Sequence, residues 1–159
     1  LITYSKSDLV GTSTEEPLQL SIDVDYDFPN HSKGSMLKLA NTTFVGRTTA
    51  LYQTNWIDTL ADILTKYPRV RVKMNVYTDA RKSDRKNYQL AKARAAELQQ
   101  QLRKRNVDSD QFLIEPMGEQ KMLNDCVDGI RCTIEQHAIN NRVELIVMSG
   151  RFFWIPLIN

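Results

Sequence analysis

The chain has 159 residues and a mass of 18.3 kDa, with 42% hydrophobic and 25% charged residues. This length fits one domain, and this composition is that of a folded protein rather than a disordered one. No run approaches the roughly 18 apolar residues that a spanning helix requires, so we predict no membrane span in this chain. The net charge of +2 is unevenly distributed: residues 66–105 hold 13 of the 21 bases and 3 of the 19 acids, a local charge of +10.

The first predicted element is a strand over residues 18–28, where apolar and polar residues alternate along LQLSIDVDYDF. A polar stretch with two glycines follows over residues 29–49, which is long for a connection. Residues 51–67 predict a helix, because apolar residues recur there at three- and four-residue steps and Pro68 stops the pattern.

Five further elements are predicted downstream. Residues 69–78 form a strand, and residues 84–105 form a helix whose apolar face carries Tyr88, Ala91, Ala95, Leu98 and Leu102. A strand over 111–117, a short helix near 133–139 and a strand over 142–148 complete the order. Strands that alternate with helices predict an α/β or α+β sandwich with helices packed on one sheet.

Two cysteines, Cys126 and Cys132, stand six positions apart among turn-forming residues. They could close a small loop as a disulfide, which would imply an exported protein, or they could be two unrelated cysteines. A metal site is less well supported, because His137 is the only nearby imidazole and no second ligand pair is present.

Known catalytic patterns are missing from the sequence: it has no Gly-rich phosphate loop, nucleophile elbow or HExxH motif. Asp23, Asp25 and Asp27 could be metal ligands, but their spacing is not that of an EF-hand, and a solvated strand face is the favoured interpretation. We expect His31 and His137 to be solvated as well. We therefore predict a protein that is not an enzyme and that has no cofactor and no metal site.

The most informative segment is residues 76–95, where a strand ends at Thr78 and Asp79 and a helix then carries Asn87 and Arg94. Two helical residues seven positions apart lie on the same flank of the helix. A carboxylate beside a guanidinium can bind a zwitterion, with Asp79 taking an ammonium and Arg94 a carboxylate. The alternative is an internal Asp79–Arg94 ion pair that ties the strand to the helix.

These residues resemble the OmpA-like peptidoglycan-binding domain of Gram-negative envelopes. That family has a Gly-His-Thr-Asp strand end, a helix with Asn, Leu-Ser and Arg-Ala, and Asn-Arg-Arg-Val-Glu before the last strand. The fifteen-residue interval from Asp79 to Arg94 matches the family, as does the element order over about 18–149, and one branch also has a cysteine pair before the last motif. The matching residues here are Thr78, Asp79, Asn87, Leu90, Arg94, Ala95, Asn140, Arg142, Val143 and Glu144.

The resemblance implies an α+β fold, a βαβαβ(α)β sandwich with helices packed on one face of a mixed sheet. It implies non-covalent binding of peptidoglycan through the diaminopimelate of the stem peptide. Asp79 would bind its ammonium and Arg94 its carboxylate, Thr78 and Asn87 would support the pocket, and Arg142 is a further candidate. The expected role is to anchor an envelope protein or complex to the cell wall, in the periplasm and associated with the outer membrane, with peptidoglycan and other envelope proteins as partners.

Several positions depart from the family pattern. Val76-Tyr77 replaces Gly-His, Lys82 replaces a glycine three residues after the Asp, Ala91 replaces the helix serine, and Asn141 replaces the first arginine of the last motif. These departures keep a second hypothesis open, in which the OmpA-like fold is a periplasmic protein-interaction module that no longer binds peptidoglycan.

The expected organisation is an N-terminal extension over 1–17, an OmpA-like domain over 18–150 with an insertion at about 29–50, and an apolar tail over 151–159. The tail either packs back onto the domain or binds a partner. The basic segment also allows nucleic-acid binding, but its aromatic residues are sparse, so we predict no nucleic-acid partner.

Overall fold

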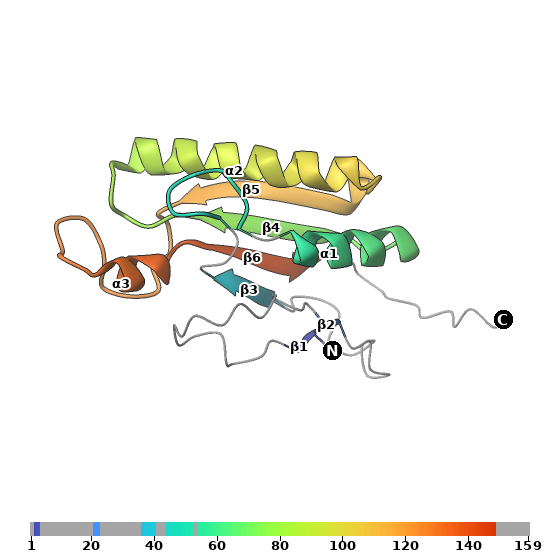
Figure 1. Ribbon diagram of the computed structural model, residues 1–159, viewed down its shortest axis with the longest axis horizontal. Helices are drawn as coiled ribbons and strands as arrows, with labels where there is room; N and C mark the ends of the chain where they lie inside the picture. Colours follow the sequence, from blue (N-terminus) through green and yellow to red (C-terminus); the bar gives the residue numbers. More distant parts are fainter. Residues whose placement is uncertain (1, 4–20, 23–35, 41–43, 53, 149–159) are drawn as a thin grey trace.

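The computed structural model describes residues 2–3, 21–22, 36–40, 44–52 and 54–148. Its framework is a four-stranded mixed sheet with the strand order β3-β6-β4-β5 (Figure 1). These strands are β3 (Met36–Ala40), β4 (Val72–Tyr77), β5 (Phe112–Gly118) and β6 (Arg142–Val147). β4 is parallel to β5 and antiparallel to β6, and β6 is antiparallel to β3. Two short strands, β1 (Ile2–Thr3) and β2 (Ser21–Ile22), pair separately.

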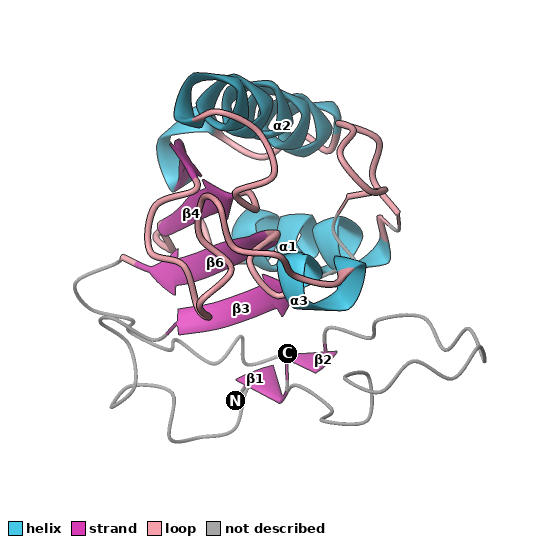
Figure 2. Ribbon diagram, turned by 90° about the vertical axis from the view of Figure 1, so that its left-hand side faces the viewer, coloured by secondary structure: helices cyan, strands magenta, loops and turns pink. Residues whose placement is uncertain are grey.

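The helices lie between the strands in the sequence. α1 (Asn55–Lys66) precedes β4, α2 (Asp84–Lys104) and the short 3-10 helix η3 (Ser109–Gln111) connect β4 to β5, and α3 (Ile134–Ala138) precedes β6. Parallel neighbours such as β4 and β5 require a crossover of this kind. Figure 2 shows α1 and α2 on the same side of the sheet. The predicted α+β sandwich with a mixed sheet is therefore confirmed. Within the described ranges, no helix has the length and hydropathy needed to cross a bilayer.

The hydrophobic core lies between the two long helices and the sheet. Alternate residues of β4 face it, because side chains point to opposite faces along a strand. Its buried members include Trp56, Ile57, Leu60 and Leu64 of α1, Leu98 and Leu102 of α2, Val72, Met74 and Val76 of β4, and Val143 and Leu145 of β6. Packing of β4 in this core fixes the position of the strand. Thr78 and Asp79, which follow its carboxyl end, then lie beside the first turns of α2.

Most predicted elements are confirmed, with shifts of a few residues at their ends. The clearest difference is β3, which lies inside the polar stretch over 29–49 where the sequence predicted no strand. β3 pairs with β6 from Met36↔Ile146 to Ala40↔Arg142, so this segment supplies an edge of the sheet. Of the predicted strand over 18–28, only Ser21–Ile22 lies within the described residues. The predicted tail, His31 and the three aspartates at 23, 25 and 27 lie outside them.

Two side-chain predictions are wrong. Tyr88 was predicted on the apolar face of its helix, but it is 48% exposed, and Asn87 is the buried residue of this turn. The first turns of α2 face a polar site rather than the apolar core, so an amide is buried there and the aromatic ring is not. His137 was predicted to be solvated, but it is buried in α3.

Candidate ligand-binding site

The carboxylate of Asp79 lies at the carboxyl end of β4, the strand flanked by β5 and β6. The preceding residue extends the pairing with β5, because the backbone N–H of Thr78 donates to Gly118 O at 2.7 Å. Both Thr78 and Asp79 are fully buried. The Thr78 hydroxyl has no hydrogen-bond partner among the described residues. The end of β4 therefore carries a buried carboxylate and, on the preceding residue, a buried hydroxyl that has no hydrogen-bond partner among the described residues.

Asp79 is surrounded by donors. Its Oδ1 accepts from Arg47 Nη1 at 2.5 Å and from the Arg81 backbone N–H at 3.0 Å. Its Oδ2 accepts from Arg81 Nη2 at 2.8 Å and from Asn141 Nδ2. Burial acts to raise the pKa of Asp79, but the hydrogen bonds from Arg81 and Asn141 and the charge of Arg47 outweigh it and lower this pKa from 3.8 to about 2. The carboxylate is therefore ionised at any physiological pH.

Asn87 and Arg94 reach the site from one face of α2. Asn87 accepts from Arg47 Nη2 at 2.7 Å, and its amide nitrogen donates to Lys82 O at 2.8 Å and to Glu119. Asn87 and Arg94 are seven positions apart, so the helix brings an amide and a guanidinium to the end of β4.

Gly118, the last residue of β5, lies close to α2. Its φ is +62°, and an added Cβ would lie 3.2 Å from the Tyr88 backbone.

Arg94 is 1% exposed, and each of its three guanidinium nitrogens donates a hydrogen bond. Nε donates to Thr48 O at 2.9 Å, Nη2 to Gly46 O at 2.7 Å and Nη1 to Asn141 Oδ1 at 3.0 Å. Burial lowers the pKa of Arg94 to about 10, and the neighbouring charge of Arg47 acts in the same direction. Arg94 is therefore still protonated at neutral pH, and this buried cation lies near the buried anion of Asp79.

Asn141 connects these two charges. Its Nδ2 donates to Asp79 Oδ2, and its Oδ1 accepts from Arg94 Nη1. The ion pairs of Asp79 are formed with Arg47 and Arg81. The internal Asp79–Arg94 ion pair considered from the sequence is thus replaced, in the described structure, by a bridge through one amide.

A short segment of the chain lies over the site, and we refer to residues 44–51 as the 44–51 loop. Its ends meet in a bridge between Phe44 and Leu51, and Val45 N donates to Ala50 O at 2.8 Å. The Phe44 ring stacks against the Arg94 guanidinium, with the Cζ atom 4.6 Å from the ring centroid. Gly46 has a φ of +50°, which other L residues rarely adopt. The loop places Arg47 and two carbonyl groups directly on the polar residues of the site.

The structure brings together four of the residues that the sequence singled out: Thr78, Asp79, Asn87 and Arg94. It gives Arg142 other contacts within the described chain. The Arg142 guanidinium pairs with Glu144 at 2.9 Å, donates to Lys121 O at 3.0 Å and stacks on the Tyr77 ring at 3.8 Å. None of these contacts is with Asp79, Asn87 or Arg94. The ligand contact that the family resemblance implies for Arg142 stays a prediction.

Sequence reasoning missed three residues of the site. Arg47 lies in the segment predicted to be an insertion, where no pattern marks it. Arg81 belongs to a basic loop in which several cations are equivalent in sequence. Asn141 was noted only as a departure from the family pattern, and the signal that could have identified it is that an amide, unlike an arginine, can serve a carboxylate and a guanidinium at once.

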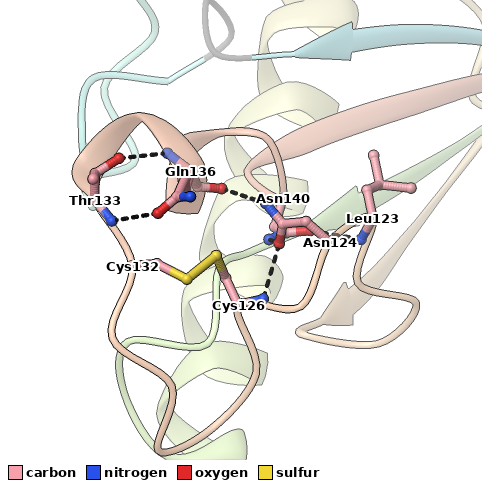
Figure 3. Close-up of a disulfide and its surroundings, with 7 residues drawn as sticks. All are labelled: Leu123, Asn124, Cys126, Cys132, Thr133, Gln136 and Asn140. Atoms are coloured by element: carbon pink, nitrogen blue, oxygen red, sulfur yellow. Dashed lines mark hydrogen bonds between the residues drawn. A yellow bond between two sulfur atoms is a disulfide. The ribbon is translucent and has the colours of Figure 1, made fainter.

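The disulfide joins Cys126 to Cys132, as Figure 3 shows, which confirms the paired interpretation of the two cysteines. Asn124 ties the loop to the chain before β6: its Oδ1 accepts from Cys126 N at 3.2 Å and from Asn140 Nδ2 at 2.7 Å. Leu123 N in turn donates to Asn140 Oδ1 at 2.7 Å. These bonds fix the residue immediately before Asn141, and so they support the bridge.

Among the residues that the structure describes, one group of acidic side chains could hold a cation. Carboxylate oxygens of Asp84, Glu119 and Asp128 lie within 4.8 Å of one another. Burial raises the pKa of Glu119, and its hydrogen bond with Asp84 acts in the same direction. Exposed acidic groups of this kind are common in proteins without a bound ion, so we assign no metal to them.

The fold and the site define an α+β domain with a polar site at the carboxyl end of a central strand, formed where a crossover helix begins. Residues 48–131 match the OmpA family, and this span is more than half of the 159 residues. The chain belongs to the OmpA family, as the sequence resemblance predicted.

Solved structures agree with this assignment. The periplasmic domain of Helicobacter pylori MotB is 26% identical, with a TM-score of 0.59 over 74% of this chain and 77% of that chain. The peptidoglycan-associated lipoprotein of Burkholderia pseudomallei is 19% identical, with a TM-score of 0.58 over 70% and 89% of the two chains. The cell wall anchor of the Pseudomonas aeruginosa T6SS is 22% identical, with a TM-score of 0.58 over 74% and 82%. The last two show likeness of fold alone. No protein in the curated set matches this chain.

Proposed function

We propose that this domain binds peptidoglycan non-covalently through the diaminopimelate of the stem peptide, and so anchors an envelope protein or complex to the cell wall. One observation carries the proposal: a buried carboxylate, Asp79, and a buried guanidinium, Arg94, lie in one site and are joined through Asn141. A buried pair of opposite charges matches a ligand that bears both an ammonium and a carboxylate.

The free end of the diaminopimelate side chain has this chemistry. Its ammonium would bind the Asp79 carboxylate, and its carboxylate would accept hydrogen bonds from the Arg94 guanidinium. Asn87 and Thr78, whose hydroxyl has no hydrogen-bond partner within the described part of the chain, would support the ligand. Such binding breaks and forms no covalent bond, so the role is that of an anchor and not of an enzyme.

The relatives support the same role. One similar structure is a peptidoglycan-associated lipoprotein, one is a cell wall anchor and one is a periplasmic domain. The Cys126–Cys132 disulfide is consistent with an oxidising compartment such as the periplasm. We accordingly propose that the protein acts in the periplasm, associated with the outer membrane, with peptidoglycan and other envelope proteins as partners.

A second function is favoured by one observation: the chain's own groups already satisfy Asp79 and Arg94. A site filled in this way suits an OmpA-like domain that has become a periplasmic protein-interaction module and no longer binds the wall. The two functions differ in whether any ligand displaces those groups.

Co-sedimentation with purified diaminopimelate-type sacculi tests the main proposal. The wild-type protein is expected to sediment with the sacculi, and Asp79→Asn and Arg94→Lys are expected to lose most of this retention. Asp62→Asn and Lys92→Met are matched controls, because they change exposed side chains of α1 and α2 and should sediment like the wild type.

Thermal melts of every variant establish that the loss is not one of folding. Folded Asp79→Asn and Arg94→Lys proteins that sediment like the wild type would rule out this site. A folded wild-type protein that does not sediment at all, but pulls down an envelope partner, would establish the second function instead.

A further inference from the structure

The 44–51 loop contacts both charged groups of the site at once. The Arg47 guanidinium reaches Asp79 through Nη1 at 2.5 Å and Asn87 through Nη2 at 2.7 Å. On either side of it in the sequence, the carbonyls of Gly46 and Thr48 accept from Arg94 Nη2 at 2.7 Å and Nε at 2.9 Å. Three consecutive residues therefore occupy the donors and acceptors that a ligand would need.

The 44–51 loop presents a positive group to Asp79 and negative groups to Arg94, as a zwitterionic ligand would. A cation of the loop faces the carboxylate, and the negative ends of two carbonyl dipoles face the guanidinium. A ligand with an ammonium and a carboxylate would present the same two signs to the same two residues. The loop is thus an internal surrogate for such a ligand, although its carbonyl groups carry only partial charges.

We propose that the 44–51 loop is a latch that closes the site in the absence of ligand, and that Arg47 is the group a ligand must displace. This inference rests on the proposed function, because the ligand that opens the latch is the zwitterionic end of the stem peptide. Displacement begins at Arg47, whose side chain is 21% exposed while that of Asp79 is fully buried.

The latch makes the site selective for ligands with both charges. A ligand with an ammonium alone replaces Arg47 at Asp79, but nothing then replaces the Gly46 and Thr48 carbonyls at Arg94. A ligand with a carboxylate alone takes Arg47 away from Asp79, which then keeps Arg81 as its one cation. In both cases one buried charge loses part of its pairing, which is costly, so the loop closes again. Only a ligand that satisfies both residues together opens the loop.

Calorimetric titration with meso-diaminopimelate tests the latch in Arg47→Met, which keeps an unbranched side chain but removes the charge. The dissociation constant is expected to fall about tenfold, which corresponds to a loop closed in roughly nine of ten wild-type molecules. Arg85→Met, at an exposed arginine of α2, is the matched control and should bind like the wild type. Cadaverine and glutarate, which carry only ammonium or only carboxylate groups, are expected to bind the wild type at least about tenfold more weakly than diaminopimelate.

A second readout needs no ligand. The Arg94 Nε–H is held against Thr48 O in the closed loop, so its exchange with water, followed by NMR, reports release of the latch. Exchange is expected to be at least about tenfold faster in Arg47→Met than in the wild type and Arg85→Met. Arg47→Lys, which cannot contact Asp79 and Asn87 with two separate nitrogens, should be intermediate.

The outcomes separate the latch from the proposed function. Unchanged Arg94 exchange in folded Arg47→Met overturns the latch whatever the ligand does. Faster exchange without any binding of diaminopimelate or sacculi supports the latch and overturns the proposed function. Faster exchange with weaker diaminopimelate binding in Arg47→Met shows that Arg47 contacts the ligand, which overturns the latch. Faster exchange with tighter diaminopimelate binding supports both the latch and the proposed function.

Discussion

Arg94 of α2 donates a 3.0 Å hydrogen bond from Nη1 to Oδ1 of Asn141, the residue that precedes β6. The other end of the same amide donates to Asp79. The bridge spans 47 residues to Arg94 and 62 residues to Asp79, so it joins the two halves of the domain at the candidate site.

Asn141→Ala removes both hydrogen bonds of the bridge. A buried donor of Arg94 then has no partner, and one oxygen of Asp79 loses a donor. The free energy of unfolding is expected to fall by about 1–3 kcal/mol, as measured by urea denaturation. Asn55→Ala, at an exposed residue of α1, should change it by less than about 0.5 kcal/mol. Equal stability of the two variants would show that the bridge contributes nothing to folding.

The low pKa of Asp79 predicts a particular acid transition. Because the folded pKa of about 2 lies below the ordinary 3.8, Asp79 stabilises the folded protein fully above pH 4, and this stabilisation is lost as the pH falls towards 2. It amounts to about 2 kcal/mol. Urea titrations at pH 5, 4, 3 and 2 should show this loss in the wild type. Asp79→Asn, which cannot titrate, should have a shallower dependence over the same range, and an identical dependence would contradict the low pKa.

Gly118 should tolerate no side chain. In Gly118→Ala, the residue would keep a φ of +62° and place its Cβ 3.2 Å from the Tyr88 backbone. Strain of about 1–2 kcal/mol is expected from the backbone alone, with a further loss from the collision with α2. Gly129→Ala is the matched control, because Gly129 has a φ of +81° but open space around the added atom. Urea denaturation should therefore show a larger loss for Gly118→Ala than for Gly129→Ala, and the reverse order would argue against the close approach.

Arg142→Met separates a structural role of this arginine from ligand binding. The change leaves the buried Glu144 carboxylate without its cation, so the free energy of unfolding should fall by about 3–5 kcal/mol. Because the family resemblance implies that Arg142 contacts the ligand, the folded fraction is expected to sediment less with sacculi than the wild type does. Sedimentation of the folded protein like that of the wild type would instead show that the role of Arg142 is structural alone.

Reduction of the disulfide tests how the loop between Cys126 and Cys132 supports the chain before β6. Closure of a loop with a sequence separation of 6 stabilises the folded state by about 2 kcal/mol. Cys126→Ser with Cys132→Ser is expected to lower the melting temperature by roughly 4–8 °C. Calorimetry measures this shift, and an unchanged melting temperature would show that the hydrogen bonds of Asn124 and Asn140 hold the loop without the bond.

The sequence predicted α1 and β4 because their apolar residues follow a clear periodicity. Helix α1 buries residues at three- and four-residue steps, and β4 alternates between the core and the opposite face. β3 escaped prediction because MLKLA is short and lies among polar residues, and its place in the sheet depends on pairing with β6, more than a hundred residues away.

The site could be predicted only where its residues are local in sequence. Thr78, Asp79, Asn87 and Arg94 belong to one strand–loop–helix unit, so helix geometry and the family pattern were sufficient to find them. Arg47 and Asn141 reach the same place from distant parts of the chain, and only the three-dimensional fold brings them there. The prediction also placed Tyr88, and not Asn87, on the buried face of the helix. Hydrophobic periodicity marks apolar residues only, so it cannot identify a buried polar side chain.

The site draws on a loop before α1, the end of β4, one face of α2 and the residue before β6, so it exists only when the whole sheet has assembled. A chain that has emerged as far as α2 holds the carboxylate and the guanidinium but lacks the amide that links them. A growing or partly degraded domain therefore has no complete site, and any ligand that needs both charges and the amide between them would bind only after folding is finished.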